Sequence, residues 1–468
     1  MDNSDFTKWS NRATNWGQTY LDTLRDRPVR AQIKPGEIAA KLPKTAPENP
    51  EDMEAIFADF ERIIPDGMTH WQHPRFFAYF PTNGSTPAMV AEQLVTTLSA
   101  QCMLWQTSPA ATELECVVID WLRDALGLAP GFSGVLQDTA TTATFAAVLT
   151  MRERALNWQG LADGLGGRIL RIYASAQTHS SIDKSVRLAG IGHNNLVKIP
   201  TDDNFAMQPN ALRAAIVDDM ANGFTPAGVI ACVGGTSIGA SDNVSEVIAV
   251  AREFDLYTHV DAAWAGSAML CPEFRPLWQG VNGADSIVFN PYKWLGALSD
   301  CSVQFLADPT LQVRTLGLRP AYLETIGTED VTNFNEWTIP LGRRFRALKL
   351  WFILRAYGLE ELRLRIRNHV SWVRELEGAI AAHPDFTITT ESRLALFTFQ
   401  YTPKGADADR LTELLLAKIN DDGRIYLTQT IHEGRFVIRM TAGHFDCTRK
   451  DVMSVHDVIT ELAVTLAD

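Results

Sequence analysis

Three signals are missing from this sequence, and each absence excludes a class of protein. The six cysteines contain no C-x-x-C pair, so neither a zinc site nor a disulfide framework is predicted. No apolar run approaches about 20 residues, the length that a membrane-spanning helix needs. Basic residues are too few to balance the acidic ones, and the formal charge of -13 argues against nucleic acid or an anionic membrane as a partner.

Export and repeat signals are absent as well. The first residues, MDNSDFTKWSNR, are polar and acidic, so no export signal is predicted, and the scattered cysteines fit a reducing cytosol. We find no internal repeat and no low-complexity tract. The composition that is present, 46% hydrophobic and 21% charged over 468 residues, is that of a globular core with two or three structural units. We therefore expect a folded, cytoplasmic protein that acts on small molecules.

The first part of the chain is predicted to be helical. Apolar and aromatic residues recur at spacings of three and four from Phe6 to Leu24, which indicates an amphipathic helix. Residues 27–50 are rich in proline and predict an irregular connector, followed by a helix from about Pro50 to Ile64. The aromatic face of the first helix needs a partner, and periodicity does not distinguish its own domain from another subunit. We expect residues 1–80 to form a helical arm.

Strands and helices alternate from Arg168 onward, which predicts an α/β fold with a mainly parallel sheet. The strand cores, such as residues 228–233, are continuously apolar, as expected when helices cover both faces. We assign residues 81–355 to a large domain and residues 356–468 to a smaller C-terminal α+β domain. A helix after Arg343 is predicted to stop at Gly358. Strands are predicted near residues 395–400 and 435–440.

Two signatures each close a predicted strand: His259-Val260-Asp261-Ala262-Ala263-Trp264 and Phe289-Asn290-Pro291-Tyr292-Lys293-Trp294-Leu295-Gly296. Ligands collect beyond the carboxyl ends of the strands in such sheets, so Asp261 and Lys293 are predicted to face one site. A lysine that forms an imine and an acid that holds a ring nitrogen protonated suit pyridoxal phosphate. On this pair alone, a strand-end cap and a surface lysine remain an open alternative.

Longer runs around these signatures carry a resemblance. HVDAAWAGSAMLCPEFR, FNPYKWLG and DCS resemble the group II pyridoxal-phosphate decarboxylases, and most closely the aromatic-L-amino-acid decarboxylases. The similarity extends from Asp5 almost to the C-terminus, through HPRFFAYFPT, SPAATELE, ASAQTHSSIDKS and IPLGRRFRALKLWF. It implies the type I, aspartate aminotransferase-like fold of PLP-dependent transferases. It also implies a homodimer in which the arm packs across the subunits and the active site lies at their interface.

The resemblance assigns roles around the cofactor. Lys293 would form the imine, Asp261 would keep the ring nitrogen protonated, and Ala263 would lie against the ring. His179, in Gln177-Thr178-His179-Ser180-Ser181, would stack on the ring, although a lone histidine is more often structural. Thr236 would supply a hydroxyl, because Gly235 replaces the first threonine of a Gly-Thr-Thr-Ser pattern.

A phosphate site is predicted before the apolar helix that follows residue 139. Helix starts and hydroxyl groups bind phosphate, so Ala140 and Thr141 are assigned to it, with help from Asn290. Asp138 departs from the family, where glycine is usual, and places a negative charge nearby. A threonine-rich N-cap without a ligand is the alternative.

The substrate site is assigned from the same resemblance. Its aromatic pocket falls in the block that contains Trp71, Tyr79, Phe80 and Thr82, although aromatic clusters more often form core. Gln101 and Met103 fall where the dimer neighbour contributes apolar groups, and they make the pocket more polar and more adaptable.

Two departures from the family concern proton transfer. Tyr292 stands before the lysine, where histidine is common. The loop Glu324 to Trp337 resembles the mobile catalytic loop whose tyrosine protonates the carbanion, and Phe334 aligns with that tyrosine. In plant relatives the same replacement accompanies aldehyde formation, and Tyr292 could supply the missing hydroxyl. A slip of the alignment remains open, because Tyr322 is nearby.

We therefore predict a decarboxylase that converts an aromatic L-amino acid to the amine and CO2, without a metal. The alternative is decarboxylation with oxidative deamination, which gives an aldehyde, ammonia and peroxide. Aminotransferase activity and a non-catalytic relative are further alternatives, since fold does not fix function. Intact Lys293 and Asp261 argue against the non-catalytic reading.

Overall fold

The computed structural model describes residues 3–318 and 331–467. The chain divides into two compact units. One comprises Met1–Pro81, Trp372–Glu391 and Phe397–Asp468, and the other comprises Thr82–Ser371 and Ser392–Leu396. The division at residues 80 and 355 expected from the sequence stays a prediction.

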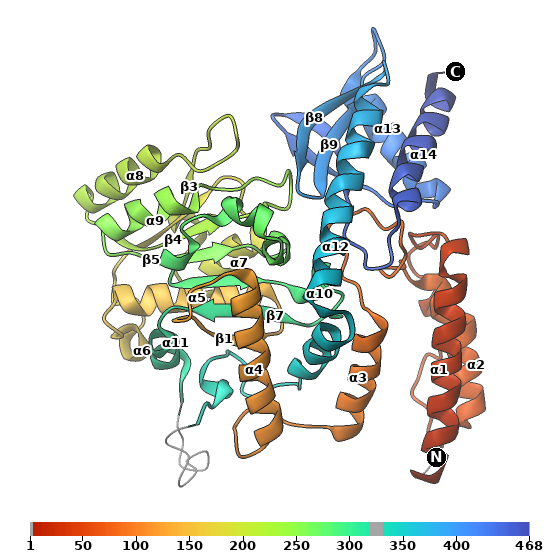
Figure 1. Ribbon diagram of the computed structural model, residues 1–468, viewed down its shortest axis with the longest axis horizontal. Helices are drawn as coiled ribbons and strands as arrows, with labels where there is room; N and C mark the ends of the chain where they lie inside the picture. Colours follow the sequence, from red (N-terminus) through yellow and green to blue (C-terminus); the bar gives the residue numbers. More distant parts are fainter. Residues whose placement is uncertain (1–2, 319–330, 468) are drawn as a thin grey trace. The chain divides into compact units, whose positions relative to one another are not determined.

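A seven-stranded sheet forms the centre of the second unit (Figure 1). Its order is β1-β7-β6-β5-β4-β2-β3. Strands β2 to β6 pair in parallel, whereas β7 runs antiparallel to both β1 and β6. The mainly parallel sheet is confirmed. The strands are β1 (Ser133–Gln137), β2 (Leu170–Ser175), β3 (Leu196–Ile199), β4 (Thr225–Cys232), β5 (Tyr257–Asp261), β6 (Ser286–Phe289) and β7 (Ser302–Leu306).

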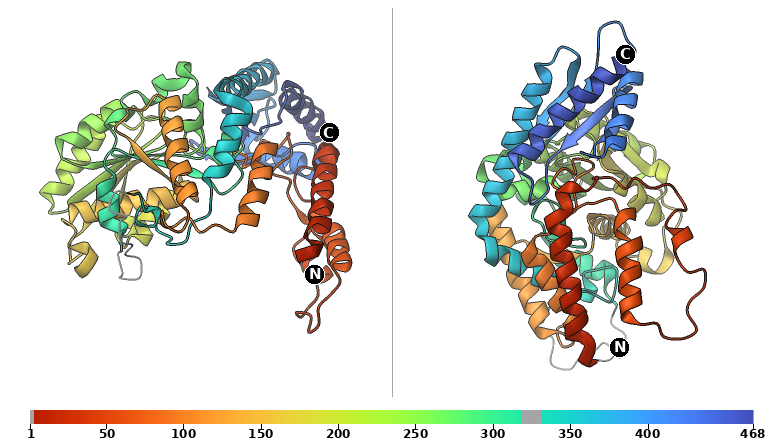
Figure 2. Two further views of the ribbon diagram at one scale, coloured as in Figure 1. Left: turned by 60° about the horizontal axis from the view of Figure 1, so that its bottom comes forward. Right: turned by 90° about the vertical axis from the view of Figure 1, so that its right-hand side faces the viewer.

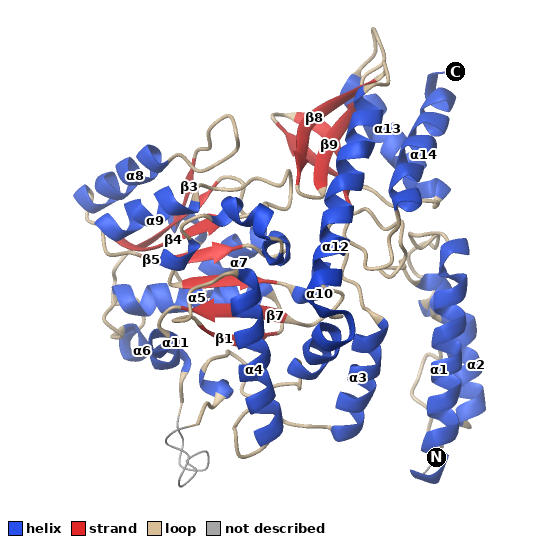
Figure 3. Ribbon diagram, in the orientation of Figure 1, coloured by secondary structure: helices blue, strands red, loops and turns tan. Residues whose placement is uncertain are grey.

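Helices surround this sheet (Figure 3). Every residue of β5, β6 and β7 is buried, including several polar side chains. Helices α5 and α7 pack on β2 and β4 through an aliphatic cluster that includes Met151, Ile182 and Ile230. The helices are α3 (Thr86–Leu98), α4 (Pro109–Leu126), α5 (Ala140–Ala155), α6 (Gly160–Asp163), α7 (Ser180–Leu188), α8 (Pro209–Ala221), α9 (Val244–Glu253), α10 (Pro291–Trp294) and α11 (Pro309–Leu316), with short 3-10 turns such as η10 (Phe334–Glu336).

The strand register aligns the ends that matter for function. Cys232 of β4 pairs with Asp261 of β5, and Asp261 pairs with Val288 of β6. The parallel strands therefore end at one edge of the sheet. The chain segments that follow β5 and β6, including Lys293, leave from that edge.

Helix α12 (Ala347–Ala381) contains a break at Gly358, whose φ of 66° and ψ of 167° are not helical. Glycine adopts a positive φ without the steric cost that other residues bear. The helix end predicted at this position is confirmed.

The first unit contains the N-terminal helices and a four-stranded sheet of order β10-β11-β9-β8. Helix α1 (Phe6–Thr23) lies beside α2 (Met53–Ile63), as the right-hand view of Figure 2 shows. Trp9 stacks on Phe57 and Trp16 meets Phe60 edge-on, so α2 covers part of the aromatic face of α1. The remaining elements are β8 (Phe386–Arg393), β9 (Leu396–Tyr401), α13 (Ala408–Asp422), β10 (Thr428–His432), β11 (Arg435–Thr441) and α14 (Arg449–Ala467).

Within the described ranges, no helix combines the length and the apolar character that crossing a membrane requires.

Candidate active site

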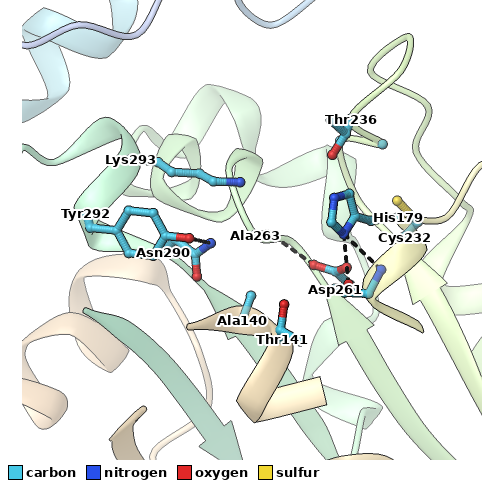
Figure 4. A pocket seen from close by; sticks show the side chains of 13 residues that line it. Ala140, Thr141, His179, Cys232, Thr236, Asp261, Ala263, Asn290, Tyr292 and Lys293 are labelled. Atoms are coloured by element: carbon cyan, nitrogen blue, oxygen red, sulfur yellow. Dashed lines mark hydrogen bonds between the residues drawn. The ribbon is translucent and has the colours of Figure 1, made fainter. Parts of the chain in front are cut away.

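Lys293 lies in the single turn of α10, directly after β6. Its backbone N–H donates to the carbonyl of Asn290 at 3.0 Å, and its own carbonyl accepts from Asn83 Nδ2 at 2.7 Å. The Asn83 N–H also donates to the carbonyl of Tyr292 at 3.2 Å. Asn83 thus fixes the lysine turn from outside, and the lysine side chain extends into a cavity (Figure 4).

Asp261 ends β5 and is 5% exposed. Its Oδ1 accepts from the backbone N–H of Ala263 at 3.1 Å, and its carbonyl accepts from the N–H of Val233 at 2.9 Å. These bonds orient the carboxylate into the same cavity that Lys293 enters (Figure 4). A buried carboxylate at this place can hold a positively charged partner.

His179 is the N-cap of α7 and lines the cavity. Its Nδ1 accepts from the backbone N–H of Ser181 at 3.1 Å, which fixes the ring and leaves Nε2 as the protonated nitrogen of the neutral tautomer. Burial lowers the pKa of His179, an effect that Asp261 opposes and Lys293 reinforces. The ring is therefore neutral at physiological pH.

The first turn of α5 contributes the opposite side of the cavity (Figure 4). Thr139 is its N-cap, and the Thr139 hydroxyl accepts from the N–H of Thr142 at 3.3 Å. The N–H groups of Ala140 and Thr141 have no partner inside the helix, because the first turn of any helix lacks preceding carbonyls. Such a helix start attracts an anion. Asp138 turns toward its own chain, since its Oδ1 accepts from the N–H of Thr139 at 2.6 Å.

The loop after β4 brings Thr236 to the cavity. Gly234 has a φ of 77°, and a Cβ there would lie 2.5 Å from the Cβ of Ala265. A Cβ on Gly235 would lie 3.0 Å from the carbonyl oxygen of Gln177. The close approach of this backbone accounts for glycine at 235, where the resemblance leads one to expect threonine.

Tyr292 enters the cavity beside Lys293 and belongs to a short chain of hydrogen bonds. Asn290 Nδ2 donates to the Tyr292 hydroxyl at 3.0 Å, and Ser302 Oγ donates to Asn290 Oδ1 at 2.6 Å. An amide NH2 can only donate, so the tyrosine keeps its own proton for another acceptor. Burial, reinforced by Asp261, raises the pKa of Tyr292 to about 12, so the hydroxyl stays protonated.

One cavity thus contains most of the residues that the sequence singled out for cofactor chemistry. Sequence reasoning did not assign four of its lining residues, although their motifs had been noticed, and it missed the supporting role of Asn83. The assigned residues are Ala140, Thr141, His179, Thr236, Asp261, Ala263, Asn290, Tyr292 and Lys293, and the unassigned ones are Ser181, Cys232, Gly234 and Gly235.

Phe334 is not among the residues that line this cavity. It is 2% exposed, with the guanidinium of Arg343 4.7 Å from its ring centroid and Trp337 meeting it edge-on. Arg343 in turn pairs with the buried Glu115 at 2.6 Å. Tyr322 and residues 324–330 of the expected loop lie outside the described residues.

The residues expected to bind substrate fall into both units. In the first, Trp71 stacks on Phe76 at 4.4 Å and on Tyr79 at 5.8 Å, and Phe80 is buried. In the second, Thr82 is half-buried, Gln101 Oε1 accepts from the N–H of Arg343, and the Met103 carbonyl accepts from Asn335. Their role in substrate binding stays a prediction.

The cavity fits pyridoxal phosphate in chemical terms. A primary amine, a buried carboxylate and a helix start surround one space, which matches the aldehyde, the ring nitrogen and the phosphate of that cofactor. Residues 3–318 and 331–467 contain no group of three His, Cys, Asp or Glu residues that could hold a metal ion.

Comparison with known proteins agrees with this chemistry. Residues 35–402 match the pyridoxal-dependent decarboxylase conserved domain. The chain is 39% identical to the aromatic-L-amino-acid decarboxylase of Sus scrofa, over 96% of this chain and 93% of that protein. Among solved structures, tryptophan decarboxylase of Catharanthus roseus in complex with L-tryptophan has a TM-score of 0.94 and 36% identity, with 100% of this chain and 99% of that chain covered. The 4-hydroxyphenylacetaldehyde synthase of Rhodiola rosea has a TM-score of 0.93 and 36% identity, with both chains fully covered.

Proposed function

The chain belongs to the pyridoxal-dependent decarboxylase family, and from this premise we propose that it removes the α-carboxylate of an aromatic L-amino acid to give the amine and CO2. The observation that carries the proposal is the single cavity in which the Lys293 amine, the Asp261 carboxylate and the start of α5 meet. The bound pyridoxal phosphate supplies an electron sink for the charge that remains when CO2 departs.

Lys293 and Asp261 hold the two chemically active ends of the cofactor. The Lys293 amine would hold the cofactor through its aldehyde carbon, and Asn83 keeps the lysine turn in place through the 2.7 Å bond to the Lys293 carbonyl. The buried Asp261 carboxylate favours a proton on the ring nitrogen, because an opposite charge nearby stabilises the cationic form. The Ala263 N–H bond keeps that carboxylate aimed at the cavity.

Ala140 and Thr141 bind the phosphate through the N–H groups that begin α5. His179, neutral and fixed by Ser181, would cover the ring, and Thr236 would provide a hydroxyl nearby. These residues would bind and orient the cofactor and exclude water.

Among the described residues that line the cavity, we assign Tyr292 as the proton donor. Its hydroxyl receives a hydrogen bond from Asn290 and stays protonated, so its proton is available at the cavity. A positioned general acid contributes roughly a hundredfold to ten-thousandfold to a rate. The hydroxyl of Tyr322, in the part of the chain that is not described, is the competing donor.

Aldehyde formation is the second candidate, because the similar Rhodiola rosea protein is a 4-hydroxyphenylacetaldehyde synthase. The sequence argument for it depends on Phe334 standing in place of a catalytic tyrosine. In the described structure the Phe334 ring is buried and packs against Arg343.

Product analysis decides between the two reactions. The purified enzyme is supplied with tyrosine, tryptophan, phenylalanine, glutamate and lysine, and CO2, amine, aldehyde, ammonia, peroxide and oxygen uptake are measured together. We expect amine and CO2 in equal amounts from an aromatic substrate, without oxygen uptake. Aldehyde with ammonia and peroxide would establish the second candidate, and turnover of glutamate or lysine alone would overturn the substrate class.

We further propose that the functional form is a homodimer in the cytoplasm. Val90, Leu94 and Leu98 form an exposed apolar stripe on α3, and Val117 and Trp121 expose another on α4. A second copy of the chain that covers these stripes removes their apolar surface from water, which favours association. Sedimentation equilibrium should give twice the chain mass, and Leu94→Glu should shift it toward the monomer. A wild-type monomer at micromolar concentration would overturn the proposal.

A further inference from the structure

The face of the large sheet that meets α5 carries buried polar side chains. His259 of β5, Ser286 of β6 and Gln304 of β7 are each 0% exposed. His259 pairs with Ser286 in the strand register, and Gln304 pairs with Val288, two residues further along β6. Buried polar groups are costly unless they are hydrogen-bonded, so this row requires a complete set of partners.

The hydrogen bonds form a directed chain. Gln304 Nε2 donates to Ser286 Oγ at 3.2 Å, and Ser286 Oγ lies 2.9 Å from His259 Nδ1. We assign the serine hydroxyl, which accepts from the amide, as the donor to Nδ1. His259 Nε2, which carries the ring proton, then donates to Thr144 Oγ1 at 3.2 Å. Burial lowers the pKa of His259 to about 4, in agreement with a neutral ring.

Gln304 is itself fixed from both sides. Its Oε1 accepts from Gln137 Nε2 at 2.9 Å and from Gln312 Nε2 at 3.1 Å, and its Nε2 donates to Gln312 Oε1 at 2.9 Å. A buried amide held in this way cannot turn over without breaking several bonds. These bonds keep the Gln304 amide in place beside Ser286.

The hydrogen bond between His259 and Thr144 connects two elements that both border the cavity. Thr144 lies one helical turn after Ala140, and His259 lies two residues before Asp261. The bond thus joins the helix that begins at the cavity to the strand that ends there. Ala140 and Asp261 stand at the two ends of the proposed cofactor site, the phosphate end and the ring-nitrogen end.

We propose that the His259–Thr144 hydrogen bond is a spacer that fixes the separation between the start of α5 and Asp261, which makes His259 and Thr144 positioning residues for the cofactor. The proposal rests on the cofactor placement given under the proposed function. A rigid ligand anchored at both ends binds best when the two anchors are held at the right separation beforehand. Loss of the bond lets α5 and β5 shift against each other, and affinity falls.

Thr144→Val tests this with a matched control on the same helix. Valine has nearly the shape of threonine and removes only the hydroxyl. Thr150 is equally buried, but its hydroxyl donates to the Ala146 carbonyl of its own helix at 2.9 Å, so Thr150→Val loses a buried hydroxyl without touching the bridge. The dissociation constant for pyridoxal phosphate is measured by fluorescence on each apoprotein. We expect it to rise on the order of tenfold in Thr144→Val and less than twofold in Thr150→Val.

An unchanged affinity for pyridoxal phosphate in Thr144→Val, or an equal loss of affinity in both variants, would contradict the proposed spacer role. Urea unfolding of the apoproteins guards against a general effect: Thr144→Val should lose more stability than Thr150→Val, because it leaves the buried His259 Nε2 without a partner, and affinities are compared where both variants are fully folded.

A second measurement does not involve the cofactor. Nitrogen-15 NMR of histidine-labelled apoprotein, with the signal assigned through its loss in His259→Gln, should show His259 protonated at Nε2 and not at Nδ1. The opposite tautomer would overturn the assigned direction of the chain even if Lys293 and Asp261 act as proposed. Conversely, failure of the Lys293 and Asp261 assignments would leave this signal unchanged, so the two failures are distinguishable.

Discussion

Replacing Asp261 by asparagine tests the electrostatic core of the site. The side chain is 5% exposed and its Oδ1 is held by the Ala263 N–H, so asparagine can occupy nearly the same place without the charge. An opposite charge within about 4–6 Å shifts a pKa by roughly 1–3 units, so its loss lowers the pKa of the ring nitrogen by about that much. Each unit corresponds to about 1.4 kcal/mol, and the fraction of protonated ring falls by about tenfold per unit.

We therefore expect Asp261→Asn to lower kcat by roughly 10- to 1000-fold while the cofactor still binds through Lys293 and the start of α5. CO2 release gives kcat, and fluorescence titration gives cofactor affinity. Asp285→Asn is the matched control, because Asp285 bonds Thr258 N and Oγ1 at the opposite end of the same strands. That variant should lose stability and keep its kcat. An Asp261→Asn enzyme that works within twofold of wild type would show that another group protonates the ring.

Four further outcomes are expected. Lys293→Ala should abolish turnover and the visible absorbance of the lysine-bound cofactor while the circular dichroism spectrum stays unchanged, and normal turnover would rule out the lysine assignment. Tyr292→Phe should lower the rate of amine formation by about 10²-fold or more, unless the donor is a hydroxyl elsewhere, in which case rate and products stay as they were. Phe334→Tyr buries a hydroxyl, so it should lower the free energy of unfolding in urea by about 1–3 kcal/mol. A product ratio that moves toward amine in this variant would instead indicate a catalytic role for residue 334. Burial raises the pKa of Asp242 from about 3.8 to about 6, so its contribution to stability is complete below about pH 4 and is lost as pH rises through about 6. Asp242→Asn should reduce this decline in the free energy of unfolding by up to about 3 kcal/mol. Equal dependence of the free energy of unfolding on pH in the variant and the wild type would contradict this expectation.

The fold could be predicted where the sequence pattern itself determines the element. Tyr257–Asp261 was expected as a short buried strand with the bounds that β5 has, and residues 228–233 form the continuous apolar run of a strand covered on both faces. The site residues at the ends of β5 and β6 followed from the same reasoning, since parallel strands end at one edge. The antiparallel direction of β7 could not be predicted, because direction depends on how the chain returns to the sheet and not on side-chain periodicity.

Two kinds of residue escaped prediction for a different physical reason. Asn83 acts through its bonds to the lysine turn, and nothing in its neighbourhood along the chain indicates a partner more than 200 residues away. The packing of Arg343 on the Phe334 ring, and the pairing of Arg343 with Glu115, could not be predicted either, while the catalytic role of Phe334 stays a prediction. Contacts of this sort arise only after the chain has folded.

The polar row on β5, β6 and β7 suggests how such residues can be recognised. A strand that is buried on both faces has no water to satisfy a polar side chain, so His259, Ser286 and Gln304 each had to acquire a partner within the fold. A strand with no need of such groups would gain stability from apolar ones. Their presence two or three residues from the strand ends at the cavity edge therefore indicates a requirement for fixed geometry, and it directs mutagenesis to Ser286 and Gln304, which lie outside the two signatures, as well as to His259.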